Sequence, residues 1–441
     1  MPWRNPRSTL MLCAGLDLAG LLVVVALINA FRPLPLLPQF GWLWLTAVAY
    51  LGWGWLFGSY TLLRWPRLPV VVVVRRVLLS GLATLMLVAV ARWLVNPPLS
   101  AWMVHRSTQL LWLGGVMLWS LLVRGWLRRG VWLPTVPRFF LAGPNEEAQA
   151  VLDAWSSTPM PVRQELHWLS LEAMQEQPAP WVLAVTPALQ RDPDQRRRLE
   201  QLEESDPREV SLFPSLTLLE QQLERLPPAL VPEPWIAYSA LPWNRPFSLE
   251  RQLKRGADLL VAASLLLLTA PLLLLAALLI WLEDQGPVLY KQQRSGWLGQ
   301  PFCVWKLRTM RVAPADALPS WTVRGDQRIT QVGRWLRRLR LDELPQLLQV
   351  LSGEMSLIGP RPERPELEQE LEQRIPHYRK RHWMRPGLSG WAQVCAPYAA
   401  SVEDSELKLS YDLYYLKHFS TWLDLVILLR TIKTVLKAGG R

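Results

Sequence analysis

Two adjacent carboxylates, Asp342 and Glu343, are the residues of this 441-residue chain best suited to chemistry. They follow an arginine-rich helix and precede leucines that repeat at helical spacing from Leu344 to Leu351, so we expect them at a helix start. The backbone dipole at that point favours anions and would keep both groups ionised. Such a pair could bind a magnesium ion or attack a phosphorus atom. The simpler alternative is that Asp342 only caps the helix.

Basic residues that could neutralise phosphate groups lie on both sides of the two carboxylates. Gly359–Arg364 reads Gly-Pro-Arg-Pro-Glu-Arg, and its two prolines fix the backbone around Arg361, so a rigid guanidinium can meet phosphate oxygens in a set direction. Arg385–Trp391 is a second rigid turn that bears an arginine. The alternative for both segments is a surface turn with solvated arginines. The helix before the carboxylates contributes Arg334, Arg337, Arg338 and Arg340.

A long apolar run at Val261–Leu282 precedes this region and could span a bilayer. Basic residues flank both of its ends, and Pro271 in its centre removes an intrahelical hydrogen bond. We therefore expect a re-entrant helix over about 257–282 that breaks at Pro271, dips into one leaflet and returns. An ordinary kinked span is the alternative. Near the C-terminus, Phe419–Lys437 is predicted to form an amphipathic helix, suited either to an anionic membrane surface or to core packing.

Five motifs in a fixed order carry a resemblance to a known family. They are KLRTM, LDELPQL, MSLIGPRPE, RPGLSGWAQV and YDLYYLKHFSTWLDL, all between Leu249 and Leu436. Together they resemble the monotopic polyprenyl-phosphate glycosyl-1-phosphate transferases, the bacterial sugar transferase family, and the whole chain resembles its large multidomain branch. The resemblance implies a mostly helical catalytic domain over 249–441 with a re-entrant membrane helix.

The resemblance also implies a reaction. A UDP-sugar would donate sugar-1-phosphate to polyprenyl (undecaprenyl) phosphate, and UMP would leave. The product would be a polyprenyl-diphosphate sugar, the first lipid-linked intermediate of exopolysaccharide, capsule or O-antigen synthesis. Asp342 would be the nucleophile that forms a phospho-aspartyl intermediate, and Glu343 together with Asp342 would hold Mg²⁺. The residues that would bind the substrate or position the carboxylates are Lys306, Arg308, Arg337, Arg361, Arg364 and Arg385.

Three positions depart from the commoner pattern of that family. Ala270 precedes the breaking proline where serine is frequent, and Leu307 replaces a frequent phenylalanine in the KLRTM motif. Cys395-Ala396-Pro397 stands where Asn-Gly is usual. The third departure bears most on the donor, so the sequence leaves the transferred sugar open.

The first 127 residues contain four apolar stretches, each near the ~20 residues of a membrane span. They are about Leu10–Ala30, Phe40–Ser59, Val77–Val95 and Thr108–Leu127. Four in succession with few internal charges favour a four-helix transmembrane block over 1–133, rather than buried core helices. Arginines gather on one side, which places both ends of the block in the cytoplasm. With the resemblance, this implies a multi-pass protein of the bacterial inner membrane, with its catalytic domain on the cytoplasmic face. The arginines on the cytoplasmic side are Arg4, Arg7, Arg64, Arg67, Arg75, Arg76, Arg124, Arg128, Arg129 and Arg138, against Arg32, Arg92 and Arg106 on the other.

Between 134 and 230, predicted strands alternate with helices, which suggests a small parallel α/β module. The strands are Arg138–Ala142, Trp181–Val185 and Val210–Phe213. A strand, Gly143 and a helix in succession resemble a Rossmann-type unit, but the G-x-G-x-x-G signature is absent, so a structural or interaction role is favoured. Six prolines between 227 and 246 predict a linker, which we place at 231–248.

Composition narrows the classes of function. Half of the residues are apolar and only 19% are charged, which excludes disorder as the main state. The excess of basic over acidic residues, 48 − 36 = 12, favours anionic partners such as phospholipids and nucleotides. Nucleic acid is disfavoured as a partner, because the arginine cluster adjoins acidic residues and no recognised motif appears. The three cysteines lie far apart and predict neither a disulfide nor a metal site.

A non-catalytic membrane scaffold or sensor for polysaccharide assembly is the competing functional class. It would require a degenerate C-terminal half, and the intact Asp342–Glu343 pair with Arg361 argues against it. The sequence leaves open whether the chain forms a homodimer.

Overall fold

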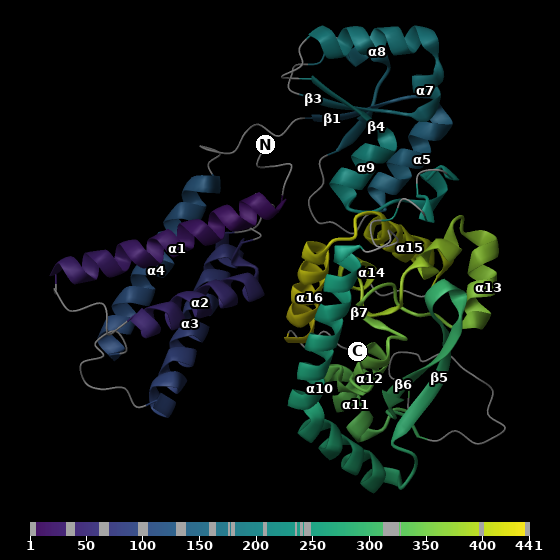
Figure 1. Cartoon of the computed structure of the whole chain (residues 1–441). Coiled ribbons are helices and arrows are strands. Elements are labelled where there is room, and N and C mark those ends of the chain that lie inside the picture. The colour runs from purple at the N-terminus through teal and green to yellow at the C-terminus, as the bar shows by residue number, and fades with distance from the viewer. Residues whose placement is uncertain are drawn as a thin grey trace. The chain divides into compact units, whose positions relative to one another are not determined.

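The computed structural model divides the chain into two units (Figure 1). The first lies within Met1–Arg138, and the second holds nearly all residues after it. The residues that the structure describes are 6–31, 40–60, 70–95, 105–128, 138–157, 165–174, 177, 181–205, 210–233, 236–238, 241, 248–311, 326, 328–396 and 401–436.

Four helices make up the described part of the first unit. They are α1 (Pro6–Phe31), α2 (Phe40–Phe57), α3 (Val70–Val95) and α4 (Arg106–Arg128). Segments of two of them, Met11–Ala30 in α1 and the whole of α3, are long and apolar enough to cross a membrane. The helices lie at the four predicted apolar stretches. That all four cross the membrane stays a prediction.

A buried ion pair joins α1 to α4. Arg124 Nη2 lies 2.9 Å from Asp17 Oδ2, and both side chains are almost completely buried. Ser120 Oγ donates to the same carboxylate at 2.7 Å. Charges at such depth require partners, so this ion pair contributes to the packing of α1 against α4. That Arg124 marks the cytoplasmic side of the block stays a prediction. Other arginines of the predicted flanks lie outside the described residues: Arg4, Arg32, Arg64, Arg67 and Arg129.

The second unit begins with a four-stranded sheet covered by helices. The strand order is β2-β1-β3-β4, and the pairs β1–β2 and β3–β4 are parallel. Strands β1, β3 and β4 lie at the three predicted positions, whereas β2 is too short to show an alternating pattern. The elements are β1 (Arg138–Ala142), α5 (Asn145–Ser156), β2 (Leu166–Trp168), α6 (Leu171–Met174), β3 (Trp181–Val185), α7 (Pro187–Arg191), α8 (Pro193–Ser205), β4 (Val210–Pro214) and α9 (Ser215–Leu223).

The segment that follows α9 packs into the core of the C-terminal half. Leu226, Val231, Ile236 and Leu241 are buried there, and the amide of Leu226 donates to Ser410 O at 2.8 Å. The predicted linker at 231–248 overlaps this segment. Its prolines, of which Pro234, Pro242 and Pro246 lie outside the described residues, interrupt helices and strands without preventing burial of the apolar residues between them.

Helix α10 (Leu249–Asp284) is one continuous 36-residue helix with Pro271 inside it. It is long and apolar enough to cross a membrane, and only 11% of its most apolar window is buried. The helix changes direction along its length (Figure 1). A proline inside a helix lacks the N–H of one intrahelical bond and is the ordinary cause of such a bend. Whether the helix returns to the same face of a membrane stays a proposal.

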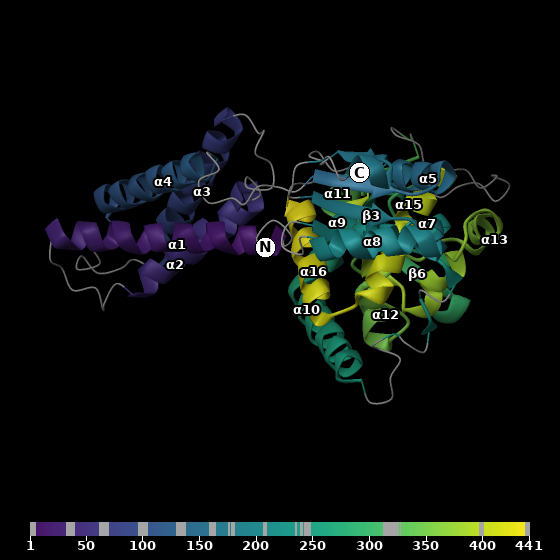
Figure 2. The same cartoon turned by 90° about the horizontal axis from the view of Figure 1, so that it is seen from above.

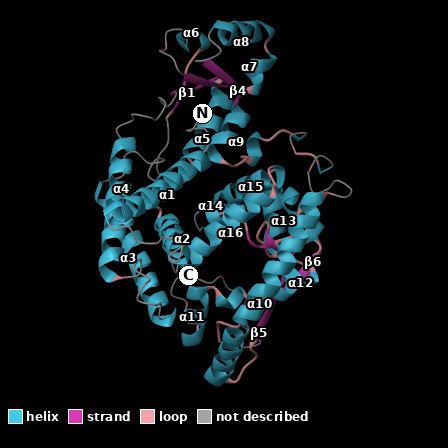
Figure 3. Cartoon of the chain, turned by 60° about the vertical axis from the view of Figure 1, so that its left-hand side comes forward, coloured by secondary structure: helices cyan, strands magenta, loops and turns pink. Residues whose placement is uncertain are grey.

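Short strands and helices complete the second unit (Figure 3). The strands β5 and β6 form an antiparallel hairpin, and β7 pairs with β8 in parallel. Helix α16 lies beside α10 (Figures 1 and 2). The elements are β5 (Leu289–Ser295), β6 (Pro301–Leu307), α11 (Gln331–Leu339), α12 (Gln346–Ser352), β7 (Ser356–Ile358), α13 (Pro365–Arg374), β8 (Gly387–Ser389), α14 (Trp391–Cys395), α15 (Val402–Lys417) and α16 (Thr421–Leu436), with 3₁₀ turns η5 (Pro228–Leu230), η9 (Trp297–Gly299), η10 (Leu341–Glu343) and η11 (Tyr378–Trp383).

We predict that Ile236→Ala destabilises the second unit. Ile236 is 3% exposed within the core cluster that also holds Trp391 and Tyr415. Truncation should cost about 2–4 kcal/mol, because the buried site loses apolar contacts and keeps a cavity. The measurement is the thermal midpoint of the purified protein in detergent. Leu289→Ala, at a half-exposed position of β5, is the control and should leave the midpoint almost unchanged. Equal midpoints for both variants would mean that the segment around Ile236 is a linker that does not stabilise the core.

Candidate active site

Asp342 and Glu343 lie in η10, a single 3₁₀ turn between α11 and α12. Arg340 ends α11 with a left-handed backbone (φ 58°), and Pro345 precedes the first residue of α12. The two carboxylates therefore occupy a turn of their own, one step before the helix start that the leucine spacing predicts. The difference arises at Arg340, where the left-handed conformation separates the two helices.

The Glu343 carboxylate is shared by two cations from distant parts of the chain. Its Oε1 accepts from Lys306 Nζ and from Arg361 Nη2, each at 2.8 Å, and Arg340 Nη1 lies 3.8 Å from Oε2. Burial alone would raise the pKa of Glu343, but the charges of Arg361 and Lys306 hold that pKa well below its usual range. Burial lowers the pKa of Lys306, and Glu343 partly offsets that effect.

Asp342 lies in a different electrostatic environment from its neighbour. Burial, and then the charge of Glu343, raise the pKa of Asp342 to about 6, against the opposing charges of Lys306 and Arg337. Among the described residues Asp342 makes no ion pair. The sequence predicted that the helix dipole would favour ionisation of both groups. In the structure, burial outweighs that effect and raises the pKa of Asp342. Two cations bind the Glu343 carboxylate, whereas the Asp342 carboxylate makes no ion pair among the described residues.

Backbone hydrogen bonds fix the two residues that precede Arg361. Gly359 N donates to Ser389 O at 2.8 Å, and Gly387 N donates to Pro360 O at 2.9 Å. A Cβ atom at Gly387 would lie 2.1 Å from Gly359 N, so only glycine permits the two backbone segments to approach this closely. Arg361 is thereby held on a rigid turn, as its flanking prolines predict.

Helix α10 contacts the same region from its N-terminal end. Lys254 Nζ donates to Ile358 O at 2.9 Å and pairs with Asp424 Oδ2 at 2.8 Å. The buried carboxylate of Asp258 accepts from Leu357 N at 3.1 Å and from Ser356 Oγ at 2.8 Å. The apolar helix and the strand that leads into the Arg361 turn are therefore one hydrogen-bonded assembly.

Two further predicted substrate-binding residues, Arg337 and Arg308, differ in how close they lie to the carboxylates. Arg337 Nε donates to Thr309 Oγ1 at 2.8 Å, and the charge of Arg337 reaches Asp342. Arg308 is almost buried and forms a two-pronged ion pair with Asp284 at the end of α10, so its guanidinium is already occupied.

Arg364 and Arg385 complete the predicted set. Arg364 is the N-cap residue of α13, and its charge helps to lower the pKa of Arg294, although burial is the main cause. The Arg385 guanidinium lies 5.6 Å from the centre of the Trp297 ring. Burial, and then the charges of Arg255 and Arg251, lower the pKa of Arg385. No contact between Arg385 and the two carboxylates is found among the described residues.

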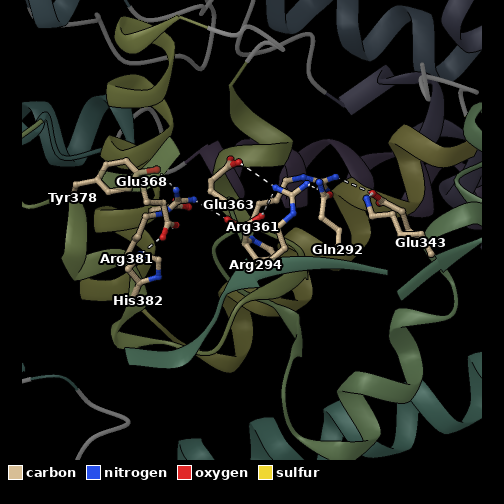
Figure 4. Close-up of polar contacts among 12 residues, drawn as sticks. Gln292, Arg294, Glu343, Arg361, Glu363, Glu368, Tyr378, Arg381 and His382 are labelled. Atoms are coloured by element: carbon tan, nitrogen blue, oxygen red, sulfur yellow. Dashed lines mark hydrogen bonds and ion pairs between the residues drawn. The ribbon is translucent and has the colours of Figure 1, made fainter. Parts of the chain in front are cut away.

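Sequence reasoning missed a polar network behind Arg361 (Figure 4). Arg381 Nη2 donates to Arg361 O at 2.9 Å and pairs with Asp412 Oδ2 at 3.1 Å. Arg294 Nη1 lies 3.7 Å from Glu363 Oε2, and Arg294 Nη2 donates to Gln292 Oε1. No spacing rule links Arg381, in a basic run, to a carboxylate thirty-one residues later in a helix, so the sequence carries no signal for this pair.

A cavity of about 420 Å³ lies beyond this network. Its lining includes Ser295, Glu368, Arg379, His382 and Trp383. His382 Nε2 lies 3.3 Å from Glu368 Oε1, and both side chains are buried. None of the predicted site residues contributes to this cavity.

The carboxylates fit the protein's share of a magnesium site. Magnesium is usually held by one or two carboxylates together with substrate phosphates and water. Asp342 is free of ion pairs within the described residues, and only the 3.8 Å approach of Arg340 engages Glu343 Oε2. The described part of the chain holds no group of three or more His, Cys, Asp or Glu residues with metal-site geometry.

Comparison with known proteins places this site within a matched region. The family model described as bacterial sugar transferase matches residues 249–438. A UDP-N-acetylgalactosamine-undecaprenyl-phosphate N-acetylgalactosaminephosphotransferase of Aeromonas hydrophila is 45% identical over 188 residues, covering 43% of this chain and 44% of that protein.

Two further relatives are glucose-1-phosphate transferases by name. The UDP-glucose:undecaprenyl-phosphate glucose-1-phosphate transferase of Escherichia coli K12 is 39% identical over 193 residues, covering 43% of this chain and 42% of that protein. The protein of the same name from Caulobacter vibrioides is 46% identical over 185 residues, covering 42% of this chain and 69% of that protein. The match thus spans less than half of the Aeromonas and Escherichia proteins.

The matched residues contain Asp342, Glu343 and the cations that surround them, together with the apolar helix α10. The match also covers most of the Caulobacter relative. These observations confirm the predicted resemblance: the chain belongs to the bacterial sugar transferase family of polyprenyl-phosphate glycosyl-1-phosphate transferases.

Proposed function

We propose that this protein transfers sugar-1-phosphate from a UDP-sugar to undecaprenyl phosphate, releasing UMP and forming an undecaprenyl-diphosphate sugar. The step would initiate exopolysaccharide, capsule or O-antigen synthesis. The observation that carries the proposal is the pair of carboxylates in η10, one locked between Lys306 and Arg361 and the other free of ion pairs within the described residues. The names of the three relatives support the same donor and acceptor classes.

The free carboxylate is suited to act as a nucleophile. An oxygen of Asp342 would attack the sugar-bearing phosphorus, forming an aspartyl–phosphorus bond while the bond to the UMP oxygen breaks. An oxygen of undecaprenyl phosphate would then attack the same phosphorus, and the aspartyl–phosphorus bond would break. The second step returns the Asp342 carboxylate and leaves the sugar phosphate on the lipid.

The surrounding cations would offset the negative charge of the two substrates. Lys306 and Arg361 hold Glu343 and orient η10, and together they carry one more charge than that carboxylate neutralises. Arg337 adds a positive charge near Asp342. Phosphoryl transfer depends chiefly on such positioning and charge compensation. When bound, Mg²⁺ held by Asp342 and Glu343 would supply further neutralisation of the diphosphate.

The membrane would bring the lipid substrate to this site. Helix α10 exposes apolar residues over most of its length, and its N-terminal end is bonded to the strand that leads to Arg361. We propose that α10 enters and leaves the same leaflet of the inner membrane. The carboxylates would then stay in the cytoplasm, where the UDP-sugar is available, at the level of the acceptor's phosphate.

Replacing the nucleophile should abolish turnover. Purified Asp342→Asn should release UMP at less than about one thousandth of the wild-type rate, because the amide cannot form the intermediate. The measurement is UMP released from a panel of UDP-sugars in the presence of undecaprenyl phosphate and magnesium. Asp404→Asn, at the capping box of α15, is the matched control and should keep nearly full activity. Full activity in Asp342→Asn would remove Asp342 from this role.

UMP release should depend on Mg²⁺, and Glu343 should contribute to the affinity for the ion. Chelation with EDTA should stop UMP release, and added Mg²⁺ should restore it. Glu343→Gln should raise the Mg²⁺ concentration for half-maximal activity by roughly tenfold, since one carboxylate ligand becomes a weaker amide ligand. An Mg²⁺ titration of initial rates gives both results. Undiminished turnover in EDTA would exclude the metal from the reaction.

The segments before and after α10 should both lie in the cytoplasm. In a background without Cys13, Cys303 and Cys395, cysteines replacing the exposed residues Glu172 and Arg379 should resist a membrane-impermeant maleimide in spheroplasts and react in inverted vesicles. Arg106→Cys, at the first residue of α4, should show the opposite pattern. Labelling of Arg379→Cys but not Glu172→Cys in spheroplasts would mean that α10 crosses the membrane.

A further inference from the structure

The turn that carries Arg361 is fixed through its carbonyl oxygens. Prolines on both sides of Arg361 lack N–H groups, so this stretch cannot take part in a regular strand ladder. Gly387 N donates to the carbonyl before Arg361 at 2.9 Å, and Ser295 N donates to Glu363 O at 3.0 Å. The carbonyl of Arg361 itself accepts from a side chain instead of a backbone amide.

That side chain is Arg381 of η11. Its Nη2 donates to Arg361 O at 2.9 Å, while its Nη1 donates to Tyr378 OH at 2.6 Å. Asp412 Oδ2 of α15 lies 3.1 Å from the same Nη2. Arg381 is 6% exposed and Asp412 1% exposed. A buried planar guanidinium with partners on both prongs has one orientation, so it defines where the Arg361 carbonyl must lie.

The position of the Arg361 backbone decides what its side chain can reach. Arg361 Nη2 lies 2.8 Å from Glu343 Oε1, yet the Arg361 side chain is 38% exposed and is not enclosed by packing. A long and partly exposed side chain keeps one rotamer only if its backbone and its terminal partner are both fixed. Arg381 supplies the backbone constraint, and Glu343 is the partner (Figure 4).

We propose that Arg381, held by Asp412, is a positioning residue that places Arg361 against Glu343 and so orders the catalytic turn. The inference rests on the proposed function, because its effect is measured on sugar-phosphate transfer. Neither residue contacts Asp342 or Glu343 among the contacts described, and Arg381 contacts Arg361 directly, so we expect the effect to pass through Arg361.

A double-mutant cycle tests this route. Arg381→Lys and Asp412→Asn are each made alone and together with Arg361→Ala, and kcat/KM for UMP release is measured for every variant. Each single change should lower kcat/KM by about 10- to 100-fold, the scale expected when a catalytic group is misplaced. In the Arg361→Ala background the same changes should lower kcat/KM by less than about threefold, because the residue through which they act is gone.

Asp412→Asn tests the same route if Arg381→Lys does not fold. Asparagine has the same shape as aspartate, so Asp412→Asn removes the charge beside Arg381 and leaves no cavity in the buried site. Thermal midpoints in detergent establish that each variant is folded. If Arg381→Lys does not fold, the cycle with Asp412→Asn decides the question.

Arg225→Lys is the matched control for a buried arginine. Arg225 is 3% exposed and donates to Ala154 O and to Ser157 Oγ, far along the chain from the turn of Arg361. Whatever factor this change produces in kcat/KM should be the same with and without Arg361→Ala.

The outcomes separate the two proposals. Losses from Arg381→Lys or Asp412→Asn that multiply with the loss from Arg361→Ala overturn the positioning role and leave the proposed function standing. Wild-type kcat/KM in folded Arg381→Lys also overturns it. A wild-type protein that releases no UMP from any donor overturns the proposed function and this inference with it. Losses that vanish in the Arg361→Ala background support both.

Discussion

One carboxylate bound by two cations organises the catalytic half of this protein. Glu343 comes from a 3₁₀ turn, Lys306 from the end of a hairpin strand, and Arg361 from a proline-flanked turn. A carboxylate that is 12% exposed is stable in its ionised form only with partners of opposite charge. The shared ion pair therefore draws three separate segments together. It also leaves positive charge in excess, beside a second carboxylate that has no ion pair among the described residues.

The backbone around this centre is constrained to match. Gly359 and Gly387 pass at a distance that no side chain would allow. Backbone amides bind the carbonyls of Pro360 and Glu363, and Arg381 binds the carbonyl of Arg361 between them. Helix α10 joins the same assembly through Lys254 and Asp258. Because the apolar helix is bonded to β7, the strand that leads into the Arg361 turn, the depth of the helix in a bilayer would set the height of the site above it. Preorganisation of this kind is what phosphoryl transfer requires from a protein scaffold.

The sequence predicted the elements whose cause is local. Helical spacing of leucines located α12, apolar length located α10 and the helices of the first unit, and the motif order identified the family. Among the predicted site residues, Glu343, Lys306 and Arg361 are in contact. Arg308 pairs with Asp284, and its predicted role in binding substrate stays a prediction. The Arg381–Asp412 pair was beyond reach, because it joins a turn and a helix whose meeting depends on the tertiary fold. The raised pKa of Asp342 was also beyond reach, since burial cannot be read from charge pattern alone.

The burial of Leu226, Val231, Ile236 and Leu241 has a consequence for how such proteins can be recombined. The boundary of the matched family region at residue 249 is a boundary of sequence similarity, whereas the packed core begins more than twenty residues earlier. A chimera that exchanges N-terminal portions between relatives would need its crossover upstream of Leu226. Joined at 249, the new partner would have to bring its own apolar segment to fill the vacated groove, or the hybrid would carry an open cavity in its core.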